Sequence, residues 1–246
     1  MSTRIEFSDG GFAFLKGVFP YSQGVVALPG FAIERVRFAR PVALAEGFRQ
    51  IDAYLAARGR PRTAFCACEL RSPRPFSFEG FADFNRGYVA VLEEWKLFRD
   101  GVNPVARSNV APVVDPPAEP SFHAFSYTAP GAGAAPTTFV VAGSGEWPEG
   151  GKFPQDIVAR DDTSPEGMRA KAKCVLDTME RRMRGLGGFA WKDATAVQVY
   201  SAYALPIDDI AQRCGSGLQW NYCRPPIEGL DFEMDVRGLA TERVLR

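Results

Sequence analysis

Asp115-Pro-Pro-Ala-Glu-Pro-Ser-Phe-His-Ala-Phe125, near the middle of the chain, has a counterpart near its end, Arg224-Pro-Pro-Ile-Glu-Gly-Leu-Asp-Phe-Glu-Met-Asp-Val-Arg237. Each stretch has a double proline, a glutamate two residues later, and then a segment that alternates in character as a strand does. A pattern that returns later in the same chain indicates repeated structural units. These two stretches therefore predict two copies of one α/β unit.

The elements around the first stretch make up the first copy. A helix over 43–58 is indicated by apolar residues at intervals of four, three and four, and Gly59 follows as its stop. A second helix has one apolar face, and the strands are short apolar runs between turn residues. This helix is expected at 81–95, and the strands at 12–16, 24–28, 63–70 and 121–127.

The same order restarts after the small-residue segment 129–136, which has the composition of a linker. Ser164 is the expected N-cap and Pro165 the first residue of a helix that runs to about Arg184 and ends at Gly185. Strands at 137–143 and 194–202 and a short helix at 207–214 complete the second copy. We therefore predict domains at 1–128 and 129–246, each an α+β unit with two helices on one face of a mixed sheet.

The composition excludes several classes of partner. The chain has 246 residues, of which 46% are hydrophobic and 24% charged, and its 29 basic and 29 acidic residues give no net charge. A nucleic-acid or anionic-membrane binder normally has a basic excess, so neither partner is expected. No apolar run reaches the ~18–20 residues that span a bilayer, and the first residues lack the apolar core of a signal peptide. A cytoplasmic protein is expected.

Metal and disulfide chemistry are not expected either. The 5 cysteines are an odd number without a C-x-x-C pair, and His123 is the one histidine. Cys66 and Cys68 share one face of a predicted strand, but no further ligands lie near them in sequence, so a packing role is favoured. A histidine-rich metal site is therefore excluded.

Five short motifs resemble those of the Rid (reactive intermediate deaminase, or YjgF) family. In order and spacing they match two consecutive copies of the family's unit, and together they cover nearly the whole chain. They are Pro20-Tyr-Ser-Gln-Gly24, Phe81-Ala-Asp-Phe-Asn-Arg-Gly-Tyr88, Pro104-Val-Ala-Arg-Ser-Asn-Val110, Ser144-Gly-Glu-Trp-Pro148, and the ending from Arg224-Pro-Pro226 to Glu233-Met-Asp235.

This resemblance implies a chorismate-mutase-like α+β fold in each copy and assembly into trimers, with sites in clefts between neighbouring domains. It also implies hydrolysis of imines or enamines of small amino-acid-derived acids to a keto acid and ammonia, without cofactor or metal. One branch of the family acts on aminomuconate. A homo-oligomer, here a trimer of tandem chains, is therefore expected.

Neither copy matches the family pattern completely. The first copy keeps Arg107 but has His123 where the family has an acidic residue. The second copy keeps Glu233 but has Gly217 where the arginine should be. We therefore predict one composite site across an interface, with Arg107 from one copy and Ser144 and Glu233 from the other.

Hydrolysis of an imine requires a grip on the substrate's carboxylate and a group that activates water. A guanidinium such as that of Arg107 binds a carboxylate with two parallel hydrogen bonds, although a surface ion pair is the alternative role. Glu233 is the candidate acid and base, although with Asp231 and Asp235 it could form a solvated strand face. His123 could replace or assist Glu233, or could simply be packed. The sequence leaves these alternatives open.

Further residues would bind the substrate or support Arg107. Tyr21 and Asn85 would supply hydrogen bonds, Ser144 and Gly145 a hydroxyl and a backbone N–H, and Asn109 lies two residues after Arg107 in its motif. The predicted function is a deaminase acting on an enamine or imine of a small carboxylic acid, of the 2-aminomuconate type. The alternatives are a non-catalytic carboxylate sensor, a scaffold protein, and a lyase or hydrolase of a cyclic enol-ether acid.

Overall fold

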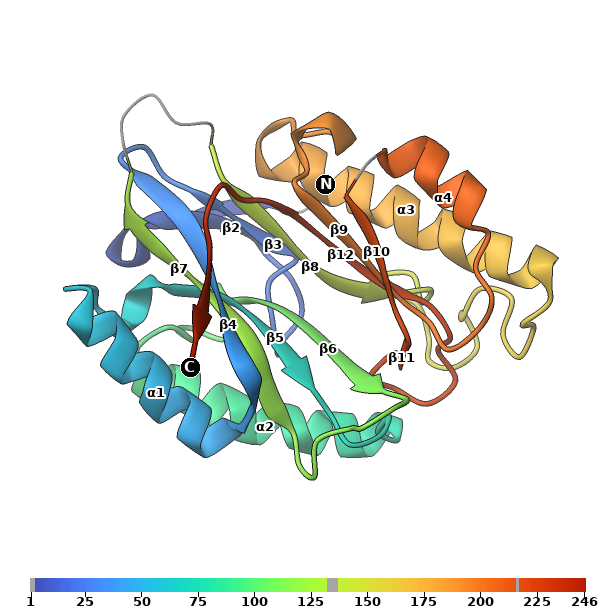
Figure 1. Ribbon diagram of the computed structural model, residues 1–246, viewed down its shortest axis with the longest axis horizontal. Coiled ribbons are helices and arrows are strands. Elements are labelled where there is room, and N and C mark those ends of the chain that lie inside the picture. Colours follow the sequence, from blue (N-terminus) through green and yellow to red (C-terminus); the bar gives the residue numbers. More distant parts are fainter. Residues whose placement is uncertain (1–2, 132–136, 216) are drawn as a thin grey trace.

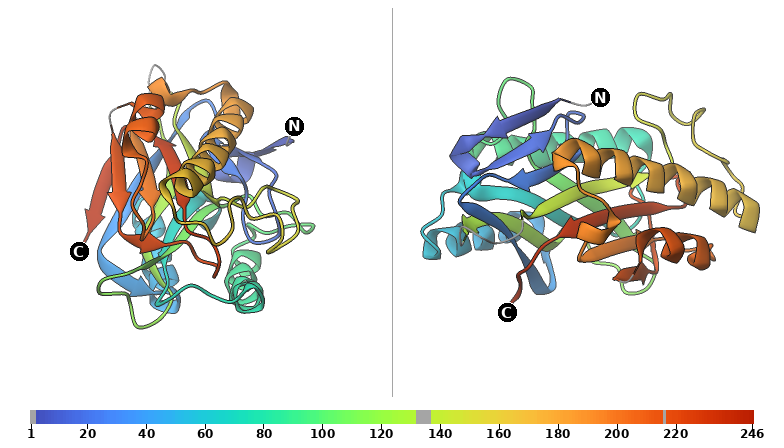
Figure 2. Two further views of the ribbon diagram at one scale, coloured as in Figure 1. Left: turned by 90° about the vertical axis from the view of Figure 1, so that its right-hand side faces the viewer. Right: turned by 90° about the horizontal axis from the view of Figure 1, so that it is seen from above.

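The computed structural model describes residues 3–131, 137–215 and 217–246. In this part of the chain, the strands form a seven-stranded and a six-stranded sheet, which pack face to face, and each sheet carries a pair of helices on its outer face (Figures 1 and 2). The result is four layers in the order helices, sheet, sheet, helices. None of the described helices is both long enough and apolar enough to cross a membrane.

The seven-stranded sheet has the order β1-β2-β3-β8-β12-β9-β10. Neighbouring strands are antiparallel except β9 and β10, which run parallel. Its strands are β1 (Arg4–Phe7), β2 (Phe12–Leu15), β3 (Gly24–Ala27), β8 (Phe139–Gly145), β9 (Ala196–Tyr200), β10 (Leu218–Asn221) and β12 (Glu233–Gly238).

The six-stranded sheet has the order β11-β6-β5-β7-β4-β13 and is mixed, since β5 runs parallel to β6 and antiparallel to β7. Its edge strands β11 and β13 both come from the last part of the chain. The strands are β4 (Phe31–Ala43), β5 (Phe65–Arg71), β6 (Ala106–Pro112), β7 (Ser121–Pro130), β11 (Cys223–Arg224) and β13 (Glu242–Leu245).

The helices cover the sheets with their apolar faces. α1 (Leu44–Ala57) and α2 (Phe78–Glu94) pack on the six-stranded sheet through an aromatic-rich cluster that includes Phe48 and Tyr88. α3 (Pro165–Gly187) and α4 (Ile207–Cys214) pack on the seven-stranded sheet through aliphatic and methionine side chains. Three short 3₁₀ helices occur at Ser8–Gly10, Arg62–Ala64 and Trp191–Asp193.

The helix predictions agree with the structure except at some ends. Ser164 caps α3 as expected, because its hydroxyl accepts a hydrogen bond from the Gly167 N–H, but α3 continues past Gly185 and stops at Gly188, which has the positive φ of 78° that a helix-ending glycine adopts. α2 begins at Phe78, three residues earlier than predicted, since Ser77 is its N-cap.

The expected Rid-type fold is wrong. It required each half of the chain to build its own small sheet, whereas β1–β3 from the first half join β8, β9, β10 and β12, and β11 and β13 from the second half join the other sheet. The two sheets thus exchange strands across residues 128/129, and neither half completes a sheet alone. The domain boundary itself stays a prediction, and the linker predicted at 129–136 lies in part outside the described residues.

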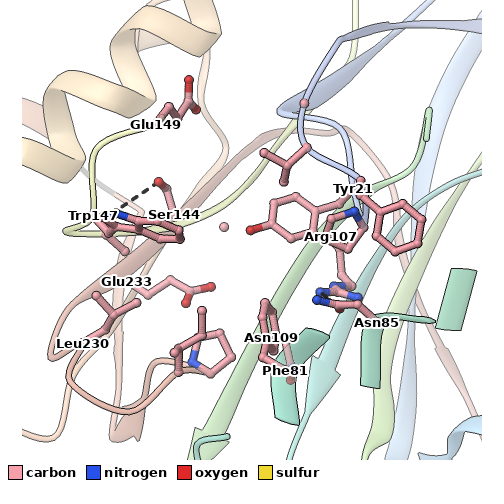
Figure 3. A pocket seen from close by; sticks show the side chains of 18 of the residues that line it. Tyr21, Phe81, Asn85, Arg107, Asn109, Ser144, Trp147, Glu149, Leu230 and Glu233 are labelled. Atoms are coloured by element: carbon pink, nitrogen blue, oxygen red, sulfur yellow. Dashed lines mark hydrogen bonds between the residues drawn. The ribbon is translucent and has the colours of Figure 1, made fainter. Parts of the chain in front are cut away.

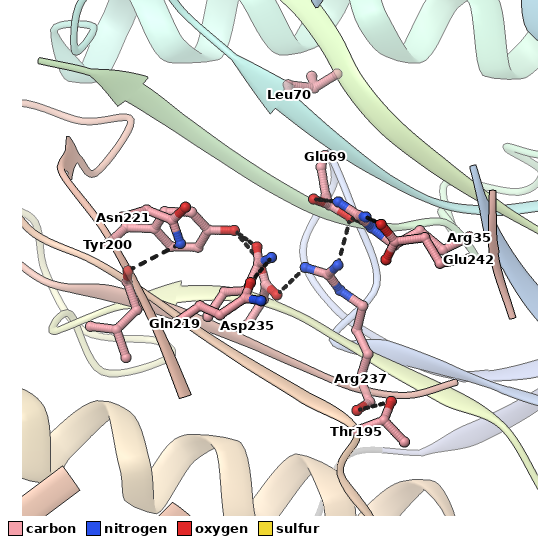
Figure 4. Close-up of polar contacts among 12 residues, drawn as sticks. Arg35, Glu69, Leu70, Thr195, Tyr200, Gln219, Asn221, Asp235, Arg237 and Glu242 are labelled. Carbon is pink, nitrogen blue, oxygen red and sulfur yellow. Dashed lines mark hydrogen bonds and ion pairs between the residues drawn. The ribbon is translucent and has the colours of Figure 1, made fainter. Parts of the chain in front are cut away.

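A buried ionic network joins the two sheets beside their apolar contact (Figure 4). Glu69 of β5 accepts hydrogen bonds from Arg35 of β4 at 2.7 and 2.8 Å, and its Oε1 lies 3.1 Å from Arg237 of β12. Arg237 in turn donates to Asp235 at 2.8 Å, and Asp235 accepts from the Tyr200 hydroxyl at 2.8 Å. Burial alone would raise the pKa of Glu69, but Arg237 and Arg35 outweigh it and hold that pKa well below its usual range.

Replacing Glu69 with alanine is expected to lower the free energy of unfolding by about 3–5 kcal/mol, because two buried guanidinium groups would lose their shared counter-charge. Urea unfolding followed by circular dichroism measures this change. The matched control is Asp52→Ala, which removes a partner of Arg62 from a partly exposed pair and is expected to cost less than about 1 kcal/mol. Equal effects of the two substitutions would contradict the inter-sheet role.

Candidate active site

A cavity of about 440 Å³ opens where the ends of the two sheets meet α2 and the loop after β8. This volume is within the ~300–1,000 Å³ usual for small-molecule sites. Its walls come from both halves of the chain, as the composite-site prediction requires, and they meet within one chain (Figure 3). Seven of the eight predicted site residues line it, namely Tyr21, Asn85, Arg107, Asn109, Ser144, Gly145 and Glu233.

Arg107 lies on β6 with its side chain under α2. It is only 2% exposed, and its Nη2 donates to the Asn85 Oδ1 at 2.7 Å. Four aromatic rings, those of Tyr21, Phe81, Phe84 and Tyr88, lie 4.8–5.6 Å from its guanidinium carbon. Rings at this distance stabilise a cation and fix its plane.

Two buried donors at this end of the cavity have no acceptor among the described residues. They are the Nη1 of Arg107 and the Nδ2 of Asn109, whose Oδ1 accepts from the Ser72 hydroxyl at 3.0 Å. No carboxylate in the described part of the chain pairs with Arg107. Because an unpaired buried charge is costly, the arrangement fits a ligand that brings a negative charge.

The loop that carries Tyr21 is tied to the residues before β6. The Asn103 side chain donates to the Pro20 carbonyl at 2.9 Å and accepts from the Val105 N–H at 3.0 Å. The Ser22 N–H donates to the Val105 carbonyl at 2.9 Å. These bonds fix the position of Tyr21 relative to Arg107, and burial raises the pKa of the Tyr21 hydroxyl, so the phenol stays protonated.

Glu233 is the first residue of β12 and is 3% exposed. Its carboxyl group and the Tyr21 hydroxyl point into the cavity from opposite sides (Figure 3). Burial raises the pKa of Glu233 well above its ordinary value, and the Asp235 carboxylate raises it further, against the opposing effect of Arg107. This shift favours the neutral form of Glu233, which can donate a proton before it accepts one.

A buried ion cluster fixes the segment before Glu233. Glu146, at the end of β8, accepts hydrogen bonds from the N–H groups of Asp231 and Phe232 at 2.7 and 3.2 Å. Lys171 of α3 lies 3.2 Å from the Glu146 carboxylate and 2.9 Å from that of Asp231. The two acidic residues predicted beside Glu233 are thus paired, Asp231 with Lys171 and Asp235 with Arg237, and do not form a solvated face.

The structure does not bring His123 to the cavity. It lies on β7, within electrostatic range of Glu69 and Arg71, and is not among the residues that line the cavity. Burial, with a further contribution from the nearby Arg71 charge, lowers the pKa of His123 to about 3, so the imidazole is neutral. Between the two candidates left open by the sequence, the geometry favours Glu233.

Sequence reasoning missed several cavity residues. Gly143 allows the close approach of Glu233, since a Cβ at this glycine would lie 2.3 Å from the Glu233 Oε1. Gln23, Glu149 and Arg182 form a polar wall, and Trp147 belongs to an aromatic one. Of these residues, Gly143 alone has a recognisable sequence signal, which is a glycine inside an apolar strand.

Among the described residues, no group of three or more His, Cys, Asp or Glu side chains is arranged to hold a metal ion. Cys66 and Cys68 are buried in β5, where Cys68 contacts the Tyr88 hydroxyl at 3.3 Å. Their surroundings are apolar, in agreement with the predicted packing role.

Comparison with known proteins gives both a family and relatives. The family model described as 2-aminomuconate deaminase CnbZ matches residues 4–243. A 2-amino-5-chloromuconate deaminase from Comamonas testosteroni is 50% identical over 253 residues, which cover 100% of both chains.

Among solved structures, the similarity is lower. A chorismatase has 12% identity and a TM-score of 0.49, with 91% of this chain and 79% of that chain covered. A cyanuric acid hydrolase from A. caulinodans has 15% identity and a TM-score of 0.42, with 85% and 66% covered.

The assignment to the Rid family is wrong, because the family model that spans almost the whole chain is a different one. The motifs that suggested Rid are short, with few fixed residues each, and a match of that kind does not establish descent. The expected trimer rested on the same resemblance, and homo-oligomer formation stays a prediction. From the match over residues 4–243 and the 50% identity to a curated relative, the chain belongs to the 2-aminomuconate deaminase CnbZ family.

Proposed function

We propose that this protein deaminates 2-aminomuconate or a close relative of it, with water as co-substrate and ammonia and a keto acid as products. The observation that carries the proposal is that one cavity holds both a buried Arg107 without a carboxylate partner among the described residues and a buried Glu233 whose pKa is raised. The curated relative acts on a chlorinated form of the same dicarboxylic enamine, which supports the choice of substrate.

Arg107 would bind the carboxylate next to the amino-bearing carbon. Its Nη1 and the Asn109 Nδ2 are two buried donors without an acceptor among the described residues, and they would each donate to this carboxylate. The Asn85 Oδ1 accepts a hydrogen bond from the Arg107 Nη2, so the Nη1 of the guanidinium is left for the ligand. Fixing the carboxylate in this way places the C=C–N unit in front of Glu233.

Glu233 would act first as an acid and then as a base. In its neutral form it protonates a carbon of the enamine, which becomes an iminium ion at C2. As a carboxylate it then takes a proton from the water that attacks C2, and a carbinolamine forms. Transfer of a proton to nitrogen, cleavage of the C–N bond and formation of the C=O bond release ammonia.

The test is ammonia release from freshly generated 2-aminomuconate, followed by the oxidation of NADPH in a glutamate dehydrogenase-coupled assay. One ammonia for each substrate consumed, at a rate well above the spontaneous hydrolysis, is expected. No release above the uncatalysed rate, together with muconate still raising the melting temperature, would contradict the deaminase and leave a carboxylate sensor.

Replacing Gly143 with alanine is expected to lower kcat by at least about 10-fold, because the new methyl group would occupy the place of the Glu233 carboxyl. Steady-state kinetics of 2-aminomuconate deamination measure the change. Gly87→Ala is the control, since a Cβ there meets no atom within 4 Å, and it is expected to leave kcat unaltered. A Gly143→Ala enzyme with full activity would contradict the position given to Glu233.

A further inference from the structure

A second buried guanidinium reaches the same cavity from the opposite wall. Arg182 of α3 is 4% exposed and lines the cavity. Its Nη1 donates to the backbone carbonyls of Ala142 and Gly143 at 2.9 and 3.3 Å. These two bonds to β8 fix the plane of the guanidinium independently of any carboxylate.

The remaining donors of Arg182 are satisfied by Glu149, a residue of the loop after β8. The Nε and Nη2 atoms donate to the Glu149 Oε1 at 3.0 and 2.6 Å, and the Gln23 Nε2 donates to the Oε2 at 3.0 Å. This carboxylate also lines the cavity, and its side chain is 31% exposed. Gly150, with a φ of 82°, follows it, so the backbone beside Glu149 has conformational freedom.

Both guanidiniums lie near Tyr21. Burial raises the pKa of the Tyr21 hydroxyl, and Arg107 and Arg182 both lower it, so both charges are within electrostatic range of one ring. Both are buried, but Arg107 lacks a protein counter-ion, whereas Arg182 has a partly exposed one. A substrate with a carboxylate at each end would bind one guanidinium with each carboxylate.

We propose that Arg182 and Gln23 form a second carboxylate subsite, in which Glu149 is a place-holder that the distal carboxylate of a dicarboxylic substrate displaces. This inference rests on the proposed function and deepens it, since it selects six-carbon dicarboxylates over monocarboxylates. In the empty protein, Glu149 prevents Arg182 from being a buried charge without a partner. A monocarboxylate would leave the Arg182–Glu149 ion pair intact and would gain no binding free energy from it.

Binding of two stable ligands by the full chain tests the subsite. cis,cis-Muconate and sorbate share the six-carbon diene, but sorbate has one carboxylate. By isothermal titration calorimetry, muconate is expected to bind about 30-fold more tightly than sorbate, because only muconate forms the second set of charge-assisted hydrogen bonds. Arg182→Gln is expected to reduce this preference to about 3-fold or less, because muconate binding weakens while sorbate binding is unaltered.

Two more variants sharpen the outcome. Arg181→Gln changes the exposed neighbour on α3 and is expected to leave both affinities unaltered. Glu149→Gln removes the competing carboxylate and is expected to tighten muconate binding by about 5-fold without affecting sorbate. If Arg182→Gln does not fold, Glu149→Gln decides the matter alone.

Equal affinities for muconate and sorbate in the wild type would overturn the subsite, and so would unaltered muconate binding in Glu149→Gln. Loss of turnover in Glu149→Gln with unaltered binding would make Glu149 a catalytic base instead, which also overturns the place-holder role. Binding is measured without turnover. An enzyme that prefers muconate but releases no ammonia would therefore contradict the proposed function and leave the subsite standing.

Discussion

Arg107→Ala is expected to lower kcat/KM for 2-aminomuconate by about 10³-fold, since a desolvated charge that binds a carboxylate contributes ~3–5 kcal/mol when its partner is present. Among the described residues, the Arg107 guanidinium hydrogen-bonds to Asn85 and pairs with no carboxylate, so its removal strands no protein carboxylate. The loss should therefore appear in ammonia release and hardly in the melting temperature.

Two control variants separate charge from geometry. Arg107→Lys keeps the charge but loses the planar fork, and about a 10-fold or greater loss is expected. Arg86→Ala removes an arginine at the rim of the cavity, 66% exposed and already paired with Asp83, and is expected to alter kcat/KM by less than about 3-fold. Comparable losses in Arg86→Ala and Arg107→Ala would contradict a specific grip by Arg107.

Glu233→Gln is expected to lower kcat by about 10³-fold, because general acid–base catalysis contributes ~10²–10⁴-fold and the amide donates no proton to carbon. The geometry of the cavity should be retained, because Gln has the same shape as the neutral acid that occupies this position. Single-turnover measurements with 2-aminomuconate would show whether the proton-transfer steps are the ones that slow.

The pH dependence gives an independent test of this role. Burial and Asp235 raise the pKa of Glu233, so the acid form persists to a higher pH than in an ordinary carboxyl group, and kcat is expected to fall as the pH rises through that raised pKa. In Glu233→Gln the descending limb should vanish from the residual rate. An identical descending limb in both enzymes would show that another group donates the proton.

Local features of the sequence predicted much of the cavity. Arg107, Asn85 and Tyr21 were selected from short motifs that resemble those of the Rid family, and they line the cavity although the chain belongs to another family. The helices were also predicted well, because their apolar spacing and caps, such as Ser164 with Pro165, are local signals.

Features that depend on distant partners could not be predicted. β4 carries Arg35 and Arg37 within its apolar pattern, and the positions of Glu69 on β5 and Glu242 on β13 explain why the buried Arg35 is tolerated there. The exchange of strands between the sheets depends on how whole layers pack together, and no single stretch of the sequence indicates it. The sequence does not indicate that Arg182 reaches the cavity, because the carbonyls and the Glu149 that hold it are 33 or more residues away.

The most direct measurement is a crystal structure of the protein with cis,cis-muconate bound. One carboxylate is expected within hydrogen-bonding distance of the Arg107 Nη1 and the Asn109 Nδ2, with the diene beside the Glu233 carboxyl. This result would give both unsatisfied donors their acceptor. Muconate bound elsewhere, with Arg107 still without an anion in the cavity, would contradict the account.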